Sequence, residues 1–439
     1  MASEGRIKEI IGRDKRIMIT TTRQQYPLVV SYGEGDYIYD VEGNRFLDFS
    51  SFIAVYNFGV NARKEIRSAA KKQIDSMMHA AFYDYYAESP VRFAEKLVSM
   101  FPRGFGKVFF SNSGTEANEA ALKFSKIFTK RPYVISFHNA FHGRTMGSLS
   151  LTYSLSVQRE HFGPFISALH APYAYCYRCP LKKSEDDACC LAGIDHIRKN
   201  ILSKEAGPGE VASIFIEPIQ GEGGYIVPPV EFVKELRKLA SENSILLVSD
   251  EVQAGYMRTG SFLALDNFGV EADIYTMAKA IGGGLPMGAT ITRTSLGDIP
   301  KGAHANTFGG NLVSIAAAEA SLNYVKRNYA YLRKMSLSKG RMIITRLLEM
   351  KERYEIIGDV RGIGMMIGIE LVKDRKSKEY ASKERDAVLY ECFNKGLILL
   401  PAGPSSIRII PPITISIANI KKGLDILEDA IKALPRRSR

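Results

Sequence analysis

Short apolar runs alternate with amphipathic segments along the chain from about residue 60 onward. Segments such as 115–130 and 230–243 repeat apolar positions at the spacing of a helix, whereas the short apolar runs are typical of buried strands. The strands predicted in this way are 107–111, 132–137, 212–218, 245–250, 273–278 and 288–293. Because strands that alternate with helices form parallel sheets covered on both faces, the pattern predicts an α/β fold with a mostly parallel sheet.

The two ends of the chain have a different pattern. Residues 27–49 alternate apolar and polar positions around turn signals, which predicts short strands. From about residue 330 onward, helical patterns surround an isoleucine-rich strand pattern at 408–417. We expect these two regions to pack together as a smaller α+β domain.

These patterns together predict two domains. The large domain is expected to span 61–325, and the small domain to combine 1–60 with 326–439. A chain of 439 residues suits this division, since domains usually contain about 100–200 residues. Residues 155–205 lack a clear period, and we expect them to form an irregular, cysteine-containing insertion in the large domain.

The net charge of the chain and the distribution of its basic residues indicate which class of ligand to expect. The chain carries 59 lysines and arginines against 47 aspartates and glutamates, a formal net charge of +12. The basic residues are dispersed apart from a cluster at 435–439, and no nucleic-acid-binding motif accompanies them, so we expect small anionic ligands rather than DNA or RNA. The sequence has neither a run of about 18 apolar residues nor an apolar leader at its start, which predicts a cytoplasmic protein without a membrane span.

Four of the five cysteines lie close together, at Cys176, Cys179, Cys189 and Cys190. Adjacent cysteine side chains rarely converge on one ion, so the final pair is poor geometry for a zinc site. We therefore predict no metal, and either a local disulfide or a set of free thiols remains open for this segment.

A predicted junction between strand and helix at 111–117 carries the first candidate site, with the sequence SNSGTEA. Gly114 permits close approach of the backbone, and the free amides at a helix start can hold a phosphate. A serine or threonine followed by glutamate is also an ordinary helix cap, so this motif alone does not decide between the two readings.

Three further motifs are informative about a ligand site only when they are considered together. Phe141 and His142 form an aromatic pair in a predicted loop, Asp250 ends a predicted strand, and Lys279 ends another just before three glycines. A carboxylate at the end of such a strand lies where α/β sheets bind ligands, and a buried lysine with a lowered pKa can form a Schiff base. A phosphate site, a stacking aromatic ring, a carboxylate for a ring nitrogen and a Schiff-base lysine are the four requirements of pyridoxal phosphate.

The chain resembles the class III, or ω-amino-acid, pyridoxal-phosphate-dependent aminotransferases of the 4-aminobutyrate type. The resemblance covers nearly the whole chain and implies the fold-type I architecture. The motifs that carry it are SNSGTEANEAALK, FHGRTMGSLSLT, IFIEPIQGEGGYIVPP, SDEVQAGYMRTG, TMAKAIGGGLPMGA, NTFGGNLVS and SIRIIPP.

This resemblance implies the roles of the residues that handle the cofactor ring. Lys279 forms the Schiff base with pyridoxal 5′-phosphate and later moves a proton between substrate and cofactor. Asp250 pairs with the pyridine nitrogen, and Gln253 lies by the ring hydroxyl. Phe141 stacks on the ring, with His142 beside it.

The resemblance also implies how the cofactor is anchored. The amides of Gly114 and Thr115 hold the phosphate, and Glu217 lies near the ring edge. Thr307 matches a residue that reaches the phosphate from the partner subunit, which implies an obligate homodimer and leaves a tetramer open.

The same family relation implies the substrates. Arg144 would bind the distal carboxylate of the amino donor, and Ile53 would line the pocket. Arg408 would bind the α-carboxylate of the acceptor, 2-oxoglutarate, and Glu222 would shield Arg408 from donors that lack this group. The implied reaction moves the amino group of an ω-amino acid such as 4-aminobutyrate, ornithine or lysine to 2-oxoglutarate.

Two alternatives remain. A branch of this family racemises or epimerises amino acids with an aspartate in place of Glu222, and the longer Glu222 could act with Lys279 as the second base. The segment at 176–180 is similar to insertions in archaeal members that include racemases, and 57–61 departs from the usual Gly-His-x-His-Pro pattern at the substrate entrance. A catalytically silent binding protein is the third interpretation, but the intact pair of Lys279 and Asp250 argues against it.

Overall fold

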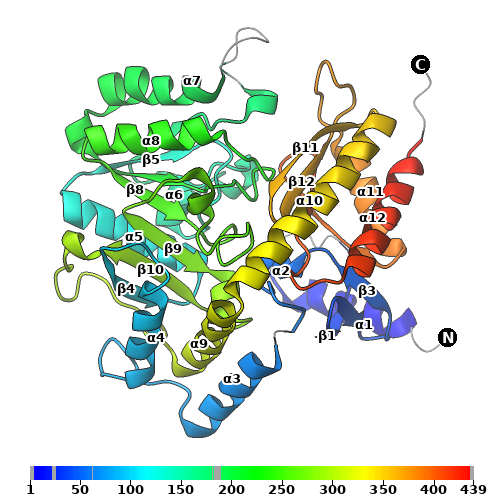
Figure 1. Ribbon diagram of the computed structural model, residues 1–439, viewed down its shortest axis with the longest axis horizontal. Helices are drawn as coiled ribbons and strands as arrows, with labels where there is room; N and C mark the ends of the chain where they lie inside the picture. The colour runs from blue at the N-terminus through cyan, green and yellow to red at the C-terminus, as the bar shows by residue number, and fades with distance from the viewer. Residues whose placement is uncertain (1–3, 22–25, 62, 180, 182–188, 436–439) are drawn as a thin grey trace.

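A seven-stranded sheet forms the centre of the larger part of the molecule (Figure 1). The computed structural model describes residues 4–21, 26–61, 63–179, 181 and 189–435. In their order across the sheet, the strands are β4 (Phe105–Ser111), β10 (Gly288–Arg293), β9 (Ile274–Ala278), β8 (Leu246–Asp250), β7 (Val211–Ile216), β5 (Tyr133–Phe137) and β6 (Ala168–Ala171). From β9 to β6 the strands are parallel, and β10 is antiparallel to both of its neighbours. The predicted α/β fold with a mostly parallel sheet is therefore confirmed.

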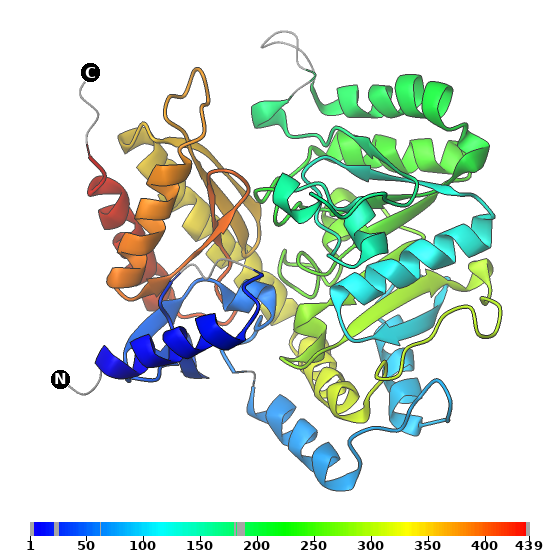
Figure 2. The same ribbon diagram turned by 180° about the vertical axis from the view of Figure 1, so that it is seen from behind.

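Helices cover this sheet on both faces because its connections run in opposite directions along it. The chain passes from β4 to β5 through α5 (Gly114–Thr129), and from β7 back to β8 through α8 (Val230–Glu242). Right-handed crossovers that run in opposite directions place their helices on opposite faces. Figure 1 shows α8 in front of the sheet, and Figure 2 shows α5 in front of it from behind. The interior strand β7 is accordingly buried at every position.

Two smaller sheets form the other part of the molecule. One contains β1 (Val30–Glu34), β2 (Tyr37–Asp40), β3 (Arg45–Asp48) and β13 (Leu397–Ile398), in that order. The other contains β11 (Ile357–Ile363), β12 (Met366–Leu371), β15 (Ser406–Ile409) and β14 (Leu400–Ala402). Because β13 pairs with β3, segments from near both ends of the chain share one sheet. The domain boundaries at residues 60 and 325 stay a prediction.

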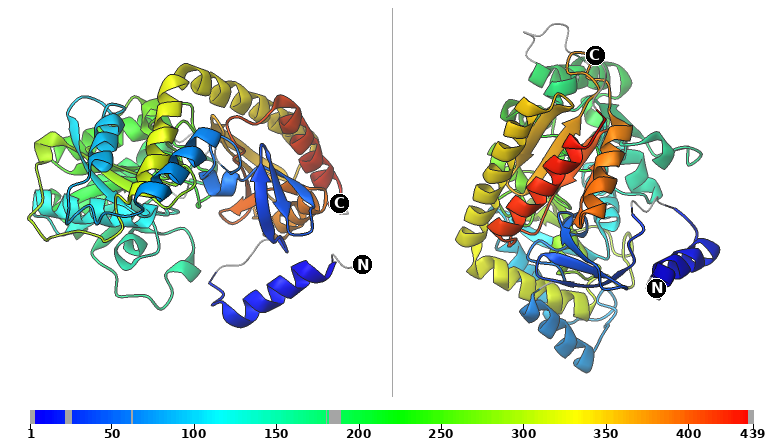
Figure 3. Two further views of the ribbon diagram at one scale, coloured as in Figure 1. Left: turned by 90° about the horizontal axis from the view of Figure 1, so that it is seen from below. Right: turned by 90° about the vertical axis from the view of Figure 1, so that its right-hand side faces the viewer.

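A layer of helices packs on the small part. The long helix α10 (Tyr329–Arg353) runs diagonally from the larger part, and α11 (Ser382–Asn394) and α12 (Ile417–Lys432) lie beside it (Figures 1 and 3). Figure 3 also shows α1 (Glu4–Ile17) on the outside of the strands β1 to β3. The other α-helices are α2 (Ser51–Ala54), α3 (Lys64–Ser76), α4 (Glu88–Val98), α6 (Met146–Leu151), α7 (Cys189–His196) and α9 (Leu312–Arg327). Within the described ranges, no helix is long and apolar enough to cross a membrane.

Two expectations about local structure were wrong. The segment 155–205 is not irregular throughout, because it supplies the edge strand β6 and the helical run from α7 through η3 (Ile197–Glu205). A four-residue edge strand, Ala-Leu-His-Ala, is too short to show a period of its own. The strand expected at 408–417 ends at Ile409, because Pro411 and Pro412 have no amide hydrogen to donate to a neighbouring strand.

The cysteine segment is described in part. Cys179 is disulfide-bonded, whereas residues 180 and 182–188 and the side chains of Cys189 and Cys190 lie outside the described residues. Among the side chains that are described, no group of three histidine, cysteine, aspartate or glutamate residues could hold a metal ion.

Candidate active site

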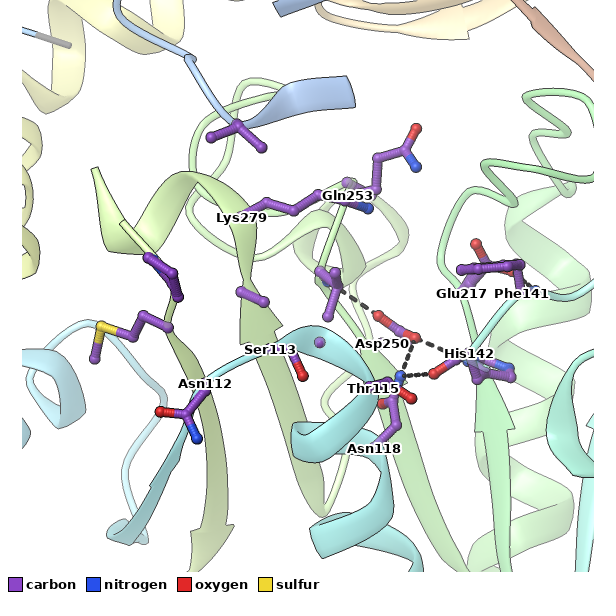
Figure 4. A pocket seen from close by; sticks show the side chains of 18 of the residues that line it. Asn112, Ser113, Thr115, Asn118, Phe141, His142, Glu217, Asp250, Gln253 and Lys279 are labelled. Carbon is purple, nitrogen blue, oxygen red and sulfur yellow. Dashed lines mark hydrogen bonds and ion pairs between the residues drawn. The ribbon is translucent and has the colours of Figure 1, made fainter. Parts of the chain in front are cut away.

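A cavity of about 490 Å³ lies at the carboxyl ends of the parallel strands (Figure 4). Four of the predicted motifs reach it from different elements. They are Gly114 at the start of α5, Phe141 in the loop after β5, Asp250 at the end of β8 and Lys279 directly after β9. Open α/β sheets bind their ligands at this edge, so the fold itself brings these side chains together.

Asp250 is held in one orientation by three donors. Its Oδ2 accepts from Asn118 Nδ2 at 2.7 Å and lies 2.8 Å from His142 Nδ1, while its Oδ1 accepts from the amide of Val252 at 3.0 Å (Figure 4). Thr276 Oγ1 donates to Asn118 Oδ1, which turns the amide nitrogen of Asn118 toward the carboxylate. The buried carboxylate is therefore oriented by its neighbours before any ligand binds.

The same contact changes the titration of His142. Burial of the ring disfavours its charged form, but the hydrogen bond to Asp250 and the charge of Asp250 outweigh this effect and raise the pKa of His142. The two residues form a unit with a fixed carboxylate directed at the cavity.

Lys279 carries an amine into the cavity from a strained position. Its φ of 51° lies in the left-handed region, which residues other than glycine occupy at a cost of about 1–3 kcal/mol. Burial lowers the pKa of Lys279, although the charges of Glu222 and Asp250 act in the opposite direction. A lowered pKa increases the fraction of neutral amine, which is the nucleophilic form.

The start of α5 is built to receive an anion. Ser113 caps the helix, and its Oγ accepts from the amide of Glu116 at 3.2 Å. The amides of Gly114 and Thr115 come first in the helix, where amides have no intrahelical acceptor. A Cβ at Gly114 would lie 2.8 Å from Val252 Cγ1, and one at Gly143 would lie 2.1 Å from Thr115 Oγ1. Both glycines therefore allow the surrounding backbone to approach closely.

Glu217 connects two loops of the cavity wall. Its carboxylate accepts from the amides of Phe141 at 2.9 Å and Gly221 at 3.0 Å. Burial raises its pKa from the ordinary 4.5 to about 7, with the charge of Asp250 adding to this effect and that of His142 opposing it. The loop that carries Phe141 is thus fixed by a group that titrates near neutral pH.

This burial predicts a pH-dependent stability. Because the pKa of Glu217 is higher in the folded than in the unfolded protein, its contribution is complete below pH 4.5 and is lost as the pH rises toward about 7. At about 1.4 kcal/mol per pKa unit, the loss is about 3 kcal/mol in the free energy of unfolding. Denaturant unfolding of the wild type and Glu217→Gln between about pH 5 and about pH 7 checks this. The variant should show a shallower decline, and equal declines would contradict the assignment.

A second charged group, the pair of Glu222 and Arg408, interacts electrostatically with Lys279, although neither residue is among the described cavity lining. Arg408 on β15 binds Glu222 through two parallel hydrogen bonds of 2.7 and 2.8 Å, and its Nε donates to the carbonyl of Pro401 at 2.8 Å. Burial alone would raise the pKa of Glu222, but the adjacent guanidinium lowers it. Glu222 is therefore an ionised partner of Arg408.

Of the remaining predicted residues, some line the cavity and others do not. Arg144 and Gln253 line the cavity, and Gln253 Oε1 accepts from Tyr225 at 2.6 Å. Ile53 is 37% exposed, and of the described residues in this segment it is Val55 that lines the cavity. Thr307 is exposed and lies outside the described cavity lining. The roles of Ile53 and Thr307 stay predictions.

Asn118 and Thr276, which orient Asp250, were not predicted. Asn118 is buried on α5 together with three alanines, Leu122, Phe124 and Ser125, and Thr276 is buried in the middle of β9. A buried polar side chain needs a hydrogen-bond partner. A polar residue among mostly apolar neighbours in each element was therefore the available signal.

Comparison with known proteins agrees with this geometry. Residues 18–431 match the family described as aminotransferase class-III, and the chain belongs to this family. A leucine/methionine racemase of Thermococcus litoralis is 38% identical over 97% of this chain and 96% of the relative. A probable 4-aminobutyrate aminotransferase of Bacillus subtilis is 34% identical over 91% of this chain and 92% of the relative.

A solved structure is also similar over the whole fold. The taurine:2-oxoglutarate aminotransferase from Bifidobacterium kashiwanohense, in complex with PLP and glutamate, has a TM-score of 0.88 and 26% identity, and the match covers 97% of each chain. The fold is that of the fold-type I transaminases, and the cofactor is pyridoxal 5′-phosphate.

The residues of the cavity fit this cofactor. The glycine-lined start of α5 suits a phosphate, and Asp250 suits a protonated ring nitrogen. Phe141 supplies an aromatic face, and the amine of Lys279 is within the same cavity.

Proposed function

We propose that this protein transfers the amino group of an ω-amino acid, such as 4-aminobutyrate, ornithine or lysine, to 2-oxoglutarate. The observation that carries the proposal is the two-bond pair of Glu222 and Arg408 near Lys279. An arginine of this kind suits the α-carboxylate of a keto acid, because its planar group binds carboxylates through two bonds. An ω-amino donor has no carboxylate on the reacting carbon, and the pair neutralises Arg408 while that donor reacts.

The other end of the donor requires a second cation. Arg144 is exposed at the cavity lining, with its guanidinium 5.6 Å from the centre of the Phe141 ring. In this proposal Arg144 binds the distal carboxylate of the donor, and Arg408 binds the acceptor. The two arginines thus recognise different substrates of the same reaction.

Each protein group has a separate task in the chemistry. Pyridoxal phosphate, when bound, supplies an electron sink for the bond broken at the substrate carbon. Lys279 Nζ would hold the cofactor and would carry the proton from the donor carbon to the cofactor. Asp250 balances the positive charge at the ring nitrogen, and His142 holds Asp250 in place. Glu222 turns away from Arg408 when the keto acid arrives.

Loss of Arg408 should therefore affect the acceptor more than the donor. We expect Arg408→Ala to raise the KM for 2-oxoglutarate about 10–100-fold, because hydrogen bonds to charged groups contribute about 1.5–3 kcal/mol each. Stopped-flow measurement of the two half-reactions separates the two substrates. Arg144→Ala is the matched control and should weaken the donor instead. Equal losses for donor and acceptor in the Arg408 variant would refute this division.

A racemase is the second candidate, favoured by the 38% identity to a leucine/methionine racemase. Glu222 would then serve as the base opposite Lys279. The lowered pKa of Glu222 and its pair with Arg408 make it a weak base, which favours amino transfer.

A single-turnover experiment in D₂O without keto acid distinguishes the two reactions. The holoenzyme is mixed separately with 4-aminobutyrate, ornithine and a chiral α-amino acid. Loss of the visible cofactor absorbance with an ω-amino acid supports the aminotransferase. Deuterium at the α-carbon with loss of chirality and unchanged absorbance means a racemase and refutes the proposal.

A further inference from the structure

Arg361 on β11 reaches from the small part to the turn that carries Glu222. Its Nε donates to the carbonyls of Gly224 at 3.2 Å and Tyr225 at 3.1 Å, and its Nη2 donates to the carbonyl of Gly224 at 2.5 Å. The Arg361 side chain is 9% exposed. One buried guanidinium therefore holds two successive peptide groups of the turn.

Carboxylates on the small part hold Arg361 in this position. Glu370, which is 2% exposed, binds Arg361 Nη2 at 2.8 Å, and Asp359 binds Nη1 at 2.7 Å. Glu370 also accepts from the hydroxyl of Tyr175 and from Arg178 Nε. The position of Arg361 is thus also determined by groups outside the turn.

Main-chain hydrogen bonds also support the turn: Gln220 and Ile226 exchange two of them, and the amides of Gly224 and Tyr225 donate to the carbonyl of Gly221. The amide of Gly403 donates to the carbonyl of Glu222 at 2.7 Å, and Gly224 has a φ of 128°. A residue in this conformation is easily moved when its partners are lost, because glycine has wide conformational freedom. The two bonds between Glu222 and Arg408 require a fixed backbone, since both carboxylate oxygens must meet the guanidinium at once.

We propose that Arg361 is a positioning residue that sets the preference of the enzyme for ω-amino donors over glutamate. It does so by holding the 220–226 turn where Glu222 covers Arg408. This inference rests on the proposed function. An ω-amino donor reacts with Glu222 and Arg408 paired, whereas glutamate needs Arg408 free for its α-carboxylate. Loosening the turn weakens the pair and so acts on the two donors in opposite directions.

The test is the ratio of kcat/KM for the best ω-amino donor to kcat/KM for L-glutamate, measured on the holoenzyme. Arg361→Met should lower this ratio about tenfold, within the range of coupling between contacting residues. Arg361→Lys keeps the charge beside Glu370 but has no planar fork, and it should restore part of the ratio. If Arg361→Met does not fold, the lysine variant decides, and an unchanged ratio there overturns the proposal.

Arg375 provides a matched control. It is a partly buried arginine in the turn after β12, and it donates to the carbonyl of Ile357 on β11 at 3.1 Å and to that of Tyr354 at the end of α10 at 3.2 Å. Arg375→Met should leave the ratio unchanged. A change equal to that of Arg361→Met would show that general loosening of the sheet causes the effect, and would overturn the proposal.

A double variant separates positioning from a merely structural role. In a Glu222→Gln background the ion pair is already lost, so Arg361→Met should cause no further change in the ratio. A further tenfold fall, or an equal loss for both donors in the single variant, would overturn the proposal. Wild-type enzyme that racemises but does not transfer amino groups would refute the proposed function, and this inference with it. A wild-type preference that survives Arg361→Met refutes the inference alone.

Discussion

Replacement of Lys279 by alanine is expected to abolish amino transfer and the visible absorbance of the Schiff base with the cofactor. The amine is the group proposed both to bind the cofactor and to move the proton, and proton transfer by a positioned side chain alone contributes about 10²–10⁴-fold. We expect turnover to fall by about 10⁴-fold or more, because both tasks are lost together. Steady-state rates and absorbance spectra of the purified variant measure the two effects.

Lys126 provides the matched control for this variant. It is a half-buried lysine on α5 whose pKa is also lowered by burial, and it lies outside the residues that line the cavity. Lys126→Ala should keep the absorbance and nearly all activity. Full activity in Lys279→Ala would remove the basis of the proposed chemistry.

Replacement of Asp250 by asparagine should have the second-largest effect. The change keeps the size of the side chain but removes the charge opposite the ring nitrogen, and it places an amide against the donors Asn118 Nδ2 and His142 Nδ1. We expect turnover to fall about 10³-fold, in the range that loss of one preorganised electrostatic group causes. The pKa of His142 should fall as well, because the hydrogen bond and charge that raise it are lost.

Kinetics and NMR titration of the His142 ring test these two effects. Asp273→Asn is the control, because Asp273 binds Arg237 and the amide of Leu247 at the opposite end of the strands. That variant should lose stability but keep its turnover per folded enzyme. An Asp250→Asn enzyme within tenfold of the wild type would show that the carboxylate is not the partner of the ring.

Strands and helices could be predicted from the sequence where a short segment has a clear pattern of apolar and polar residues. The strands β8 and β9 were predicted to within a residue of their ends, because each is a mainly apolar run that stops at a charged residue, Asp250 or Lys279. The strand β6 was missed because a four-residue edge strand has little apolar surface to reveal it. The helix α1 was not predicted either, since its apolar positions are sparse.

Some residues of the candidate site could likewise be predicted from the sequence, and others could not. Asp250 and Lys279 follow strands that lie side by side, so their placement in one cavity follows from a parallel sheet. The pair of Glu222 and Arg408 joins residues 186 positions apart, and no local spacing indicates it, so it depended on the resemblance to a family. Arg361 had no sequence signal, because its partners are main-chain carbonyls and any residue provides those.

The pairing of β13 with β3 has a consequence for the order in which the protein folds during translation. Leu397 pairs with Leu47, so this sheet cannot close until residue 397 has been made. The last strand of the large sheet ends earlier, at Arg293, and that sheet can assemble while translation continues. Arg408 emerges later still, so a nascent chain holds the cofactor-side residues long before it holds the arginine proposed for the acceptor. The order of synthesis therefore makes the arginine proposed for the acceptor the last of these site residues to be added.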